Sequence, residues 1–266
     1  MKTNYLYNEN CLDTMARMED DFLDLTVTSP PYDNLRTYNG YSFDFESIAK
    51  ELYRVTKECG VVVWVVGDAT IKGSETGTSF KQALFFKEIG FNLHDTMIYS
   101  KRNPAPQLFH KRYQNKFEYM FVFSKGQPNT CNAIRIPVET KRKSKAKVGT
   151  RNSKNEVARK KSFHRTNIDK IKGNIWEYKV GNLKEFWNNS KHPAIFPEQL
   201  ANDHIISWSN ENDLVYDPFM GSGTTAKMAK INKRKWIGSE MSSEYCNIVH
   251  ERLKQFDNDI FLNDNE

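Results

Sequence analysis

The sequence lacks the long apolar runs and the paired cysteines that define several classes of protein. No window approaches twenty consecutive apolar residues, and residues 1–10 are polar, so neither a membrane span nor a secretion signal is indicated. The cysteines lie far apart, with neither Cys-x-x-Cys nor the His/Cys spacing of zinc ligands: Cys11, Cys59, Cys131 and Cys246. These absences favour a reduced, cytoplasmic protein without a metal site.

The net positive charge of the chain is concentrated in one segment. Fourteen Lys or Arg and three acidic residues lie between Arg135 and Lys172, a local net charge of +11 in a chain whose total is +6. Apolar residues such as Phe163 and Ile168 interrupt this segment. The pattern predicts a basic insert that folds against a polyphosphate, on a mildly acidic body. A solvated lysine-rich loop is the alternative that composition leaves open.

Strand and helix patterns alternate around this insert. At 266 residues, the chain is long enough for one large α/β domain. Alternation at this pace predicts a mostly parallel, doubly wound sheet. Strands are expected at 23–29, 60–67, 94–101, 117–124, 214–216 and 236–239, and helices at 46–57, 79–89, 197–208, 224–231 and 243–255.

A glycine-rich turn follows the strand expected at 214–216. Gly221 and Gly223 lie between a strand and its following helix, where side chains would obstruct a ligand. A backbone with positive φ in such a turn favours glycine. Glu240 ends the next expected strand, 17 positions after Gly223. An acidic residue at about this distance from a glycine turn typically holds the ribose hydroxyls of a nucleoside. With Asp217 before the turn, the pattern predicts a nucleoside site, and a tight packing turn is the alternative.

A second short motif, Ser29-Pro30-Pro31-Tyr32, follows the first expected strand. Two prolines fix the backbone and remove two N–H donors, which leaves carbonyl oxygens as acceptors. The Ser29 hydroxyl adds an acceptor, and Tyr32 adds an aromatic face. An acceptor pair beside a stacking ring suits an exocyclic amino group on a flat heterocycle.

These motifs, in this order, resemble those of the β group of bacterial DNA amino-methyltransferases. The segment 28–32 resembles the catalytic motif of that group, and 217–225 resembles its S-adenosylmethionine loop. The segments 236–240, 191–200 and 12–13 resemble its other cofactor-contacting segments. The resemblance implies a Rossmann-like methyltransferase fold in permuted order. It implies cofactor contacts from Leu12, Asp13, His192, Pro193, Asp217, Phe219, Gly221, Ser222, Gly223, Thr224, Glu240 and Met241.

The same resemblance divides the chain into a catalytic half at 1–130, a target-recognition insert at 131–190 and a cofactor-binding half at 191–266. The insert matches the recognition region in position only. Double-stranded DNA is the expected partner, and a homodimer and a cognate restriction endonuclease remain open. The expected DNA-contacting residues are Arg36, Lys141, Arg142, Lys143, Lys145, Lys147, Arg151, Arg159, Lys160 and Lys161.

The identity of the acceptor base depends on Ser29. Serine at the head of Pro-Pro-Tyr is usual in the cytosine-N4 subgroup, whereas the adenine-N6 subgroup more often carries aspartate, so cytosine N4 is expected and adenine N6 is the alternative. RNA or protein methyltransferases usually carry Asn-Pro-Pro-Tyr, and a non-catalytic DNA-binding module has no need of both motifs. Methylation at cytosine C5 is disfavoured because no cysteine follows a proline. A base in a duplex reaches such a site only after it flips out of the stack.

Overall fold

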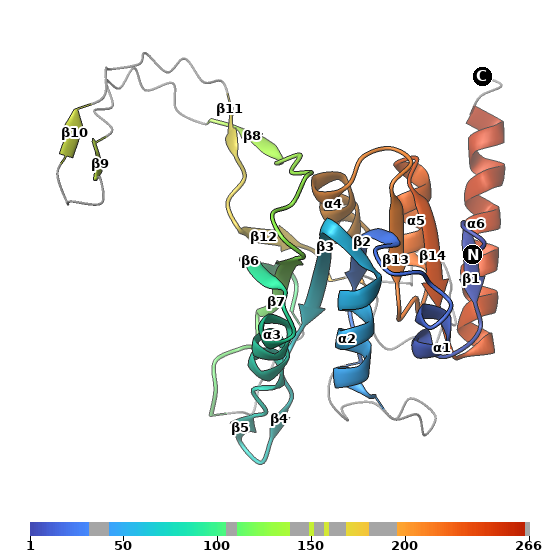
Figure 1. The fold of residues 1–266 in the computed structure, drawn as a ribbon, viewed down its shortest axis with the longest axis horizontal. Helices are drawn as coiled ribbons and strands as arrows, with labels where there is room; N and C mark the ends of the chain where they lie inside the picture. Colours follow the sequence, from blue (N-terminus) through green and yellow to red (C-terminus); the bar gives the residue numbers. More distant parts are fainter. Residues whose placement is uncertain are drawn as a thin grey trace. The chain divides into compact units, whose positions relative to one another are not determined.

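The structure is a computed structural model that describes residues 1–31, 43–104, 111–138, 149–151, 157–159, 169–180 and 196–263. The chain divides into two compact units, Met1–Asn132 with Asn174–Glu266, and Ala133–Gly173. The first unit contains an eight-stranded sheet with the strand order β1-β14-β13-β2-β3-β7-β6-β12 (Figure 1).

The strands of this sheet are β1 (Tyr5–Tyr7), β2 (Leu23–Thr28), β3 (Thr56–Val66), β6 (Asn92–Lys101), β7 (Phe117–Ser124), β12 (Ile175–Tyr178), β13 (Leu214–Asp217) and β14 (Lys235–Ser239). A separate hairpin is made by β4 (Thr70–Ile71) and β5 (Ser74–Glu75). The helices are α1 (Cys11–Met15), α2 (Phe45–Val55), α3 (Thr78–Glu88), α4 (Glu198–Trp208), α5 (Thr224–Ile231) and α6 (Ser243–Asn263).

Parallel pairing dominates the sheet and confirms the predicted fold class. Strands β1, β14, β13, β2 and β3 all run parallel to one another, and only β7 runs antiparallel to its two neighbours, β3 and β6. The main helix contacts fall into two groups, α1–α3 and α4–α6, as expected for helices on the two faces of a doubly wound sheet. No helix in the described ranges is long and apolar enough to span a membrane.

The residues of β3 show why this sheet forms the core. The run Val61–Val66 is at most 1% exposed throughout, because the strand is covered on both faces. On one face, Trp64 packs edge-on against Phe86 of α3, with ring centroids 5.2 Å apart. Its indole nitrogen donates a hydrogen bond to Gln82 Oε1 at 2.9 Å, which satisfies the buried N–H group.

Several elements differ from the sequence expectation. The helix expected at 46–57 ends at Val55, because Thr56 starts β3 and donates its hydroxyl hydrogen back to the Leu52 carbonyl at 2.6 Å. The helix expected to end at 255 continues to Asn263. The short elements β1 and α1 were not predicted, because three and five residues are too few for a periodic pattern.

The segment 131–190 contributes to both compact units. Its strand β12 pairs in parallel with β6 and belongs to the main sheet. In the second unit, β8 (Arg135–Pro137) pairs with β11 (Asp169–Ile171), and β9 (Gly149–Arg151) pairs with β10 (Val157–Arg159), both antiparallel. An ion pair of 2.8 Å joins Arg135 to Asp169 across the first of these pairs.

Candidate functional site

The carboxyl ends of three adjacent strands bring the two sequence motifs together. In the sheet, β2 lies next to β13, and β13 lies next to β14, with all three strands parallel. Ser29 follows β2, Asp217 ends β13, and Glu240 follows β14. Ligands of open α/β sheets bind at this edge, so the sheet itself places the motifs at one candidate site.

Asp217 connects the two motifs. Its Oδ1 accepts a hydrogen bond from Thr28 Oγ1 at 2.7 Å and one from the Phe219 backbone N–H at 3.0 Å. The residue is 5% exposed, and burial raises the pKa of its carboxyl to about 6, although the bonds from Thr28 and Thr225 oppose this. A buried carboxylate of this kind favours a cationic or hydroxyl-bearing ligand nearby.

The glycine turn has the backbone geometry that the sequence predicted. Gly221 and Gly223 adopt φ values of 51° and 81°, the left-handed region that favours glycine. At Gly223, an added Cβ would lie 2.9 Å from Val249 Cγ1, so the turn is also packed tightly against α6. Because Gly223 is the N-cap of α5, the turn opens onto a helix N-terminus.

Glu240 closes this turn from the neighbouring strand. Its Oε2 accepts a hydrogen bond from the Gly221 N–H at 2.8 Å, and its Oε1 accepts one from the Ser242 N–H at 2.9 Å. Burial raises the pKa of Glu240, while these backbone donors lower it. Each carboxylate oxygen keeps a second lone pair, which fits the paired hydroxyls of a ribose.

The N-terminal segment lies against the same strand end. Asn8 Nδ2 donates to the backbone carbonyls of Glu240 at 2.8 Å and Met241 at 3.1 Å. Ser239 Oγ, at the end of β14, donates to Thr14 Oγ1 of α1 at 2.9 Å. The structure thus brings α1, which contains Leu12 and Asp13, beside β14 and Met241.

The remaining predicted residues fall into three groups. Ser222 and Thr224 are buried at the turn, and Phe219 packs its ring against Phe43 and Trp64, so its side chain serves the core. Arg151 and Arg159 lie in the paired strands β9 and β10 of the second unit. Outside the described residues lie Tyr32, Arg36, Lys141, Arg142, Lys143, Lys145, Lys147, Lys160, Lys161, His192 and Pro193.

Sequence reasoning missed Arg252, a buried cation of α6 that is hydrogen-bonded to the glycine turn. Its Nη1 donates to the Ser222 carbonyl at 2.8 Å and to the hydroxyls of Ser222 and Thr224, both at 3.2 Å. Its Nη2 forms an ion pair with Glu198 at the start of α4. Nothing in the sequence marks this arginine, because it lies on a helix of ordinary amphipathic pattern about thirty residues after the turn.

Cys246 Sγ lies 3.6 Å from the Glu240 carbonyl oxygen, and burial raises the pKa of its thiol to about 11. The environment of Cys11 also opposes thiolate catalysis. The side chain is 4% exposed, and burial raises the pKa of its thiol to about 12, with a further rise from the nearby charges of Asp13 and Asp217. A thiol at this pKa carries no useful thiolate fraction near neutral pH. The site is therefore suited to direct transfer between two bound molecules rather than to a covalent cysteine intermediate.

Comparison with known proteins agrees with this geometry. The orphan methyltransferase M.BamHII of Bacillus amyloliquefaciens is 57% identical over 247 residues, which cover 89% of this chain and 91% of that protein. The structure of the PvuII DNA methyltransferase (cytosine-N4-specific) aligns with a TM-score of 0.69 and 22% identity, covering 94% of this chain and 86% of that one. The putative DNA modification methylase TTHA0409 from Thermus thermophilus, complexed with S-adenosyl-L-methionine, aligns with a TM-score of 0.62 and 22% identity over 94% and 93% of the two chains.

The DNA methylase family profile matches residues 23–251. This match includes the strand ends at Ser29, Asp217 and Glu240. The chain therefore belongs to the DNA methylase family and is a DNA methyltransferase, with S-adenosylmethionine as its cofactor.

Proposed function

We propose that the chain transfers the methyl group to the N4 amino group of cytosine at a specific site in duplex DNA. The observation that carries this proposal is Ser29, a serine where the adenine-N6 subgroup more often has aspartate. It heads the Pro30-Pro31 pair at the carboxyl end of β2, directly after Thr28, which is hydrogen-bonded to Asp217 of the glycine turn. The proposed acceptor for the base and the proposed cofactor turn are therefore held at one sheet edge.

The chain's own residues supply positioning and electrostatics. S-adenosylmethionine supplies a methyl group on a sulfonium centre. Ser29 Oγ and the Pro30 carbonyl accept hydrogen bonds from the amino group, which favours the pyramidal geometry that localises its lone pair on nitrogen. Holding the nitrogen and the methyl group in line provides much of the rate.

The cofactor-binding residues follow from the same geometry. The proposed contacts are the ribose hydroxyls with Glu240, the main chain of Gly221–Gly223 with the body of the cofactor, and Asp217 beside the turn. Both carboxylates are raised in pKa by burial, and a cofactor with a net positive charge offsets this cost. The two carboxylates and the main chain of the turn thus fit a positively charged nucleoside.

The identity of the acceptor base is tested by identifying the methylated nucleoside that the reaction forms. Plasmid DNA is incubated with the purified chain and S-adenosylmethionine, and its nucleosides are analysed by mass spectrometry. We expect N4-methylcytosine. Adenine N6 is the alternative within the family, and N6-methyladenine as the sole product contradicts the cytosine assignment while leaving the mechanism intact.

The role of Ser29 is tested by Ser29→Ala. Loss of one positioned acceptor costs about 2.7–4 kcal/mol in transition-state stabilisation, so kcat should fall by about 100- to 1,000-fold. Calorimetry should show unchanged cofactor affinity, because Ser29 contacts the base rather than the cofactor. Full activity in this variant would exclude Ser29 as the acceptor.

The basic segment within 131–190 is proposed to read the DNA target. Neutralising Lys141, Arg142, Lys143, Lys145 and Lys147 together should weaken binding to every duplex and reduce the slope of log affinity against log salt. Each phosphate contact contributes about 0.9 to that slope. An unchanged slope would assign these five residues to a solvated loop.

A further inference from the structure

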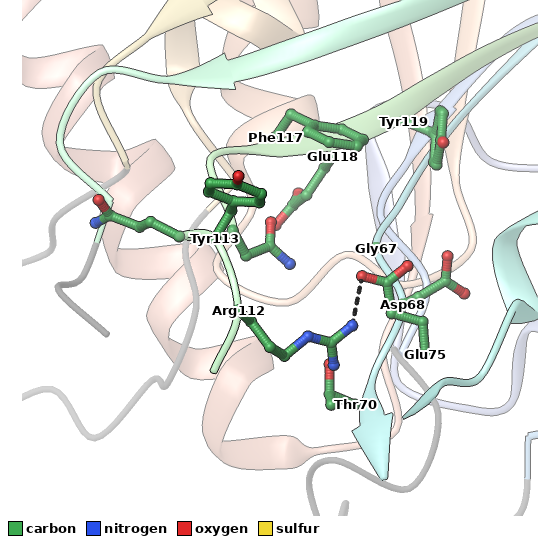
Figure 2. Close-up of a pocket in the computed structure, with 11 residues that line it drawn as sticks. Gly67, Asp68, Thr70, Glu75, Arg112, Tyr113, Phe117, Glu118 and Tyr119 are labelled. Atoms are coloured by element: carbon green, nitrogen blue, oxygen red, sulfur yellow. Dashed lines mark hydrogen bonds and ion pairs between the residues drawn. The ribbon is translucent and has the colours of Figure 1, made fainter. Parts of the chain in front are cut away.

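A pocket of about 430 Å³ lies at the same sheet edge as the catalytic motif, one strand further along. It is lined by Gly67 and Asp68, which follow β3, by Thr70 and Glu75 of the β4–β5 hairpin, and by the segment 112–119 (Figure 2). In the sheet, Thr28 of β2 pairs with Trp64 of β3, and Val66 of β3 pairs with Tyr119 of β7. Since neighbouring strands lie about 4.8 Å apart, the pocket begins about 5–10 Å from the Ser29 strand end.

One wall of the pocket is an exposed basic and aromatic segment. Every residue from Lys111 to Phe117 is exposed, and the segment carries three cations and two aromatic rings in seven residues. Tyr113 is 100% exposed and Phe117 is 46% exposed. Cations interleaved with open aromatic faces are typical of surfaces that contact phosphates and stack on unpaired bases.

The opposite wall is the β4–β5 hairpin, which projects from the end of β3 (Figure 1). Lys72 and Gly73 form its two-residue turn with φ values of 49° and 82°, as in the tight turns that hairpins prefer. Ile71, beside this turn, is 56% exposed. An exposed isoleucine beside a lysine resembles the apolar wedges that DNA-bending proteins insert between base steps.

Arg112 fixes the hairpin to the other wall. Its Nη1 donates to Thr70 Oγ1 at 2.8 Å, and its Nη2 lies 3.2 Å from Glu75 Oε1 (Figure 2). The two walls therefore form one preorganised surface, which binds at a smaller entropic cost than two separate loops.

The acidic residues of the pocket are already paired. Asp68 accepts hydrogen bonds from the N–H and hydroxyl groups of Ser79, Glu75 pairs with Arg112, and Glu118 pairs with Lys101 at 2.7 Å. Glu75 and Glu118 thus have cationic partners and Asp68 has neutral hydrogen-bond donors, whereas Lys72, Lys111 and Lys116 are exposed. The outer rim of the pocket is therefore cationic, and the acids do not prevent an anionic partner from approaching.

We propose that this rim is a second DNA-contacting surface, separate from the basic insert, that holds the strand beside the flipped base. We define this edge surface by Ile71, Lys72, Lys111, Tyr113, Lys116 and Phe117. A base that reaches Ser29 brings its duplex across this edge, and the major groove alone is about 12 Å wide, wider than the distance to the pocket. Flipping removes a stacking partner from each neighbouring base, and the exposed rings replace it.

This inference rests on the family's action on DNA and not on which base is methylated. The test uses the full chain, a 30-bp duplex of mixed sequence for binding, and plasmid DNA with labelled S-adenosylmethionine for total methyl transfer. Counting all methylated bases separates failure of this proposal from failure of the cytosine assignment.

The aromatic part is tested with the double variant Tyr113→Ala/Phe117→Ala. Its matched control is Tyr5→Ala, because Tyr5 is 38% exposed and lies on β1, four strands away from β3. We expect the double variant to bind the duplex at least about fivefold more weakly, the equivalent of 1 kcal/mol of stacking, with a matching loss of methyl transfer. The control should behave as wild type, and cofactor affinity should be unchanged in both.

The cationic part is tested with Lys72→Asn. The matched control is Lys233→Asn, since Lys233 has φ 60° and is exposed, but precedes β14 at the opposite edge of the sheet. Asparagine tolerates this left-handed conformation, so folding is preserved in both. Lys72→Asn should reduce the salt slope by about 0.9, and Lys233→Asn should not.

Two results would overturn the proposal. One is wild-type duplex affinity and salt slope in both edge variants. The other is a change in sedimentation mass without a change in DNA affinity, which would assign the edge surface to contact with a second copy of the chain.

Discussion

Thr28 and Asp217 lie 189 positions apart in the chain, yet the Thr28 hydroxyl donates a 2.7 Å hydrogen bond to the Asp217 carboxylate. Thr28 ends β2 immediately before the Ser29-Pro30-Pro31 motif, and Asp217 ends β13 immediately before the glycine turn. Both residues are buried, so the bond is shielded from water. It fixes the distance between the proposed base acceptor and the proposed cofactor turn, which methyl transfer requires.

Thr28→Val should therefore reduce both stability and turnover. The substitution keeps the shape of the side chain but removes one donor from the Asp217 carboxyl, which keeps the hydrogen bonds from Thr225 and from the Phe219 N–H. Hydrogen bonds to charged groups contribute about 1.5–3 kcal/mol, and urea unfolding should show a loss in this range. Methyl transfer should fall as well, because the two motifs lose their direct link.

Thr26→Val is the matched control for this prediction. Thr26 lies on the same strand at 1% exposure, and its hydroxyl has no hydrogen-bond partner within the described structure. Replacing an unsatisfied buried hydroxyl with a methyl group should be neutral or stabilising. A similar loss in both variants would mean that Thr28 acts through packing and not through Asp217.

The pH dependence of stability should also report on Asp217. Burial raises its pKa to about 6 in the folded chain, against an unfolded value near 3.8. Between these values the folded chain holds a proton that the unfolded chain has lost, so the free energy of unfolding falls as pH rises from about 4 to about 6. Two pKa units correspond to about 3 kcal/mol, and Asp217→Asn should lack this decrease.

Asp44→Asn provides a comparison in which the pH dependence of stability has the opposite sign. Hydrogen bonds from the side chain and backbone of Ser47 lower the pKa of Asp44, so its stabilisation is present above the unfolded pKa and is lost as pH falls. Urea unfolding of both variants and the wild type at several pH values between 3 and 7 separates the two effects. A wild-type stability that does not fall relative to Asp217→Asn over this range would contradict the raised pKa.

Gly223→Ala should weaken cofactor binding and stability together. Gly223 has φ 81°, and an added Cβ would lie 2.9 Å from Val249 Cγ1. Gly73 has a nearly identical φ of 82° with no atom within 4 Å of an added Cβ, so Gly73→Ala carries the backbone strain alone. We expect a left-handed alanine to cost about 1 kcal/mol at both positions, with an additional loss only at Gly223.

A second substitution separates the contact from the strain. Val249→Ala removes the side-chain atoms with which the new Cβ collides. The stability deficit caused by Gly223→Ala, measured as the difference between Val249→Ala and the double variant Gly223→Ala/Val249→Ala, should therefore shrink towards that of Gly73→Ala. Calorimetric titration with S-adenosylmethionine follows the turn directly. Equal deficits in the two glycine variants would show that the contact with Val249 has no energetic effect.

The sequence predicted those features of the site that depend on the conformational preferences of single residues. Pro-Pro restricts the backbone next to Ser29, and Gly221 and Gly223 have the positive φ expected of a ligand-binding turn. Alternation of strands and helices predicted that the strands are mostly parallel, and the structure adds that β2, β13 and β14 are neighbours. That order is sufficient to bring Ser29, Asp217 and Glu240 to one edge of the sheet.

Contacts between segments far apart in the chain could not be predicted from the sequence. A buried helix arginine such as Arg252 looks like any surface arginine until the fold places it under Ser222. The strand β12 has only four residues, too few for a periodic sequence pattern, and its pairing with β6 depends on tertiary structure. The edge surface was missed because Lys111–Phe117 and the β4–β5 hairpin meet only in the folded chain.

Arg252 should act as a positioning residue for the cofactor turn. Its guanidinium bridges the Ser222 carbonyl and the Glu198 carboxylate, which itself also pairs with Lys227 at 2.8 Å. Burial alone would raise the pKa of Glu198, but hydrogen bonds from Lys227 and Arg252 outweigh it and lower that pKa. The network thus ties the turn to the start of α4.

Arg252→Lys tests this role without removing the positive charge. A lysine keeps an ion pair with Glu198, but its single ammonium group cannot also reproduce the fork of bonds to Ser222 and Thr224. We expect a folded variant whose affinity for S-adenosylmethionine falls by about tenfold, the equivalent of about 1.4 kcal/mol, within the usual range for hydrogen bonds to charged groups. Lys227→Met, which removes the other cation on Glu198 and leaves the bonds to Ser222 intact, should lose stability with little change in cofactor affinity. Wild-type cofactor affinity in Arg252→Lys would restrict the arginine to a structural role.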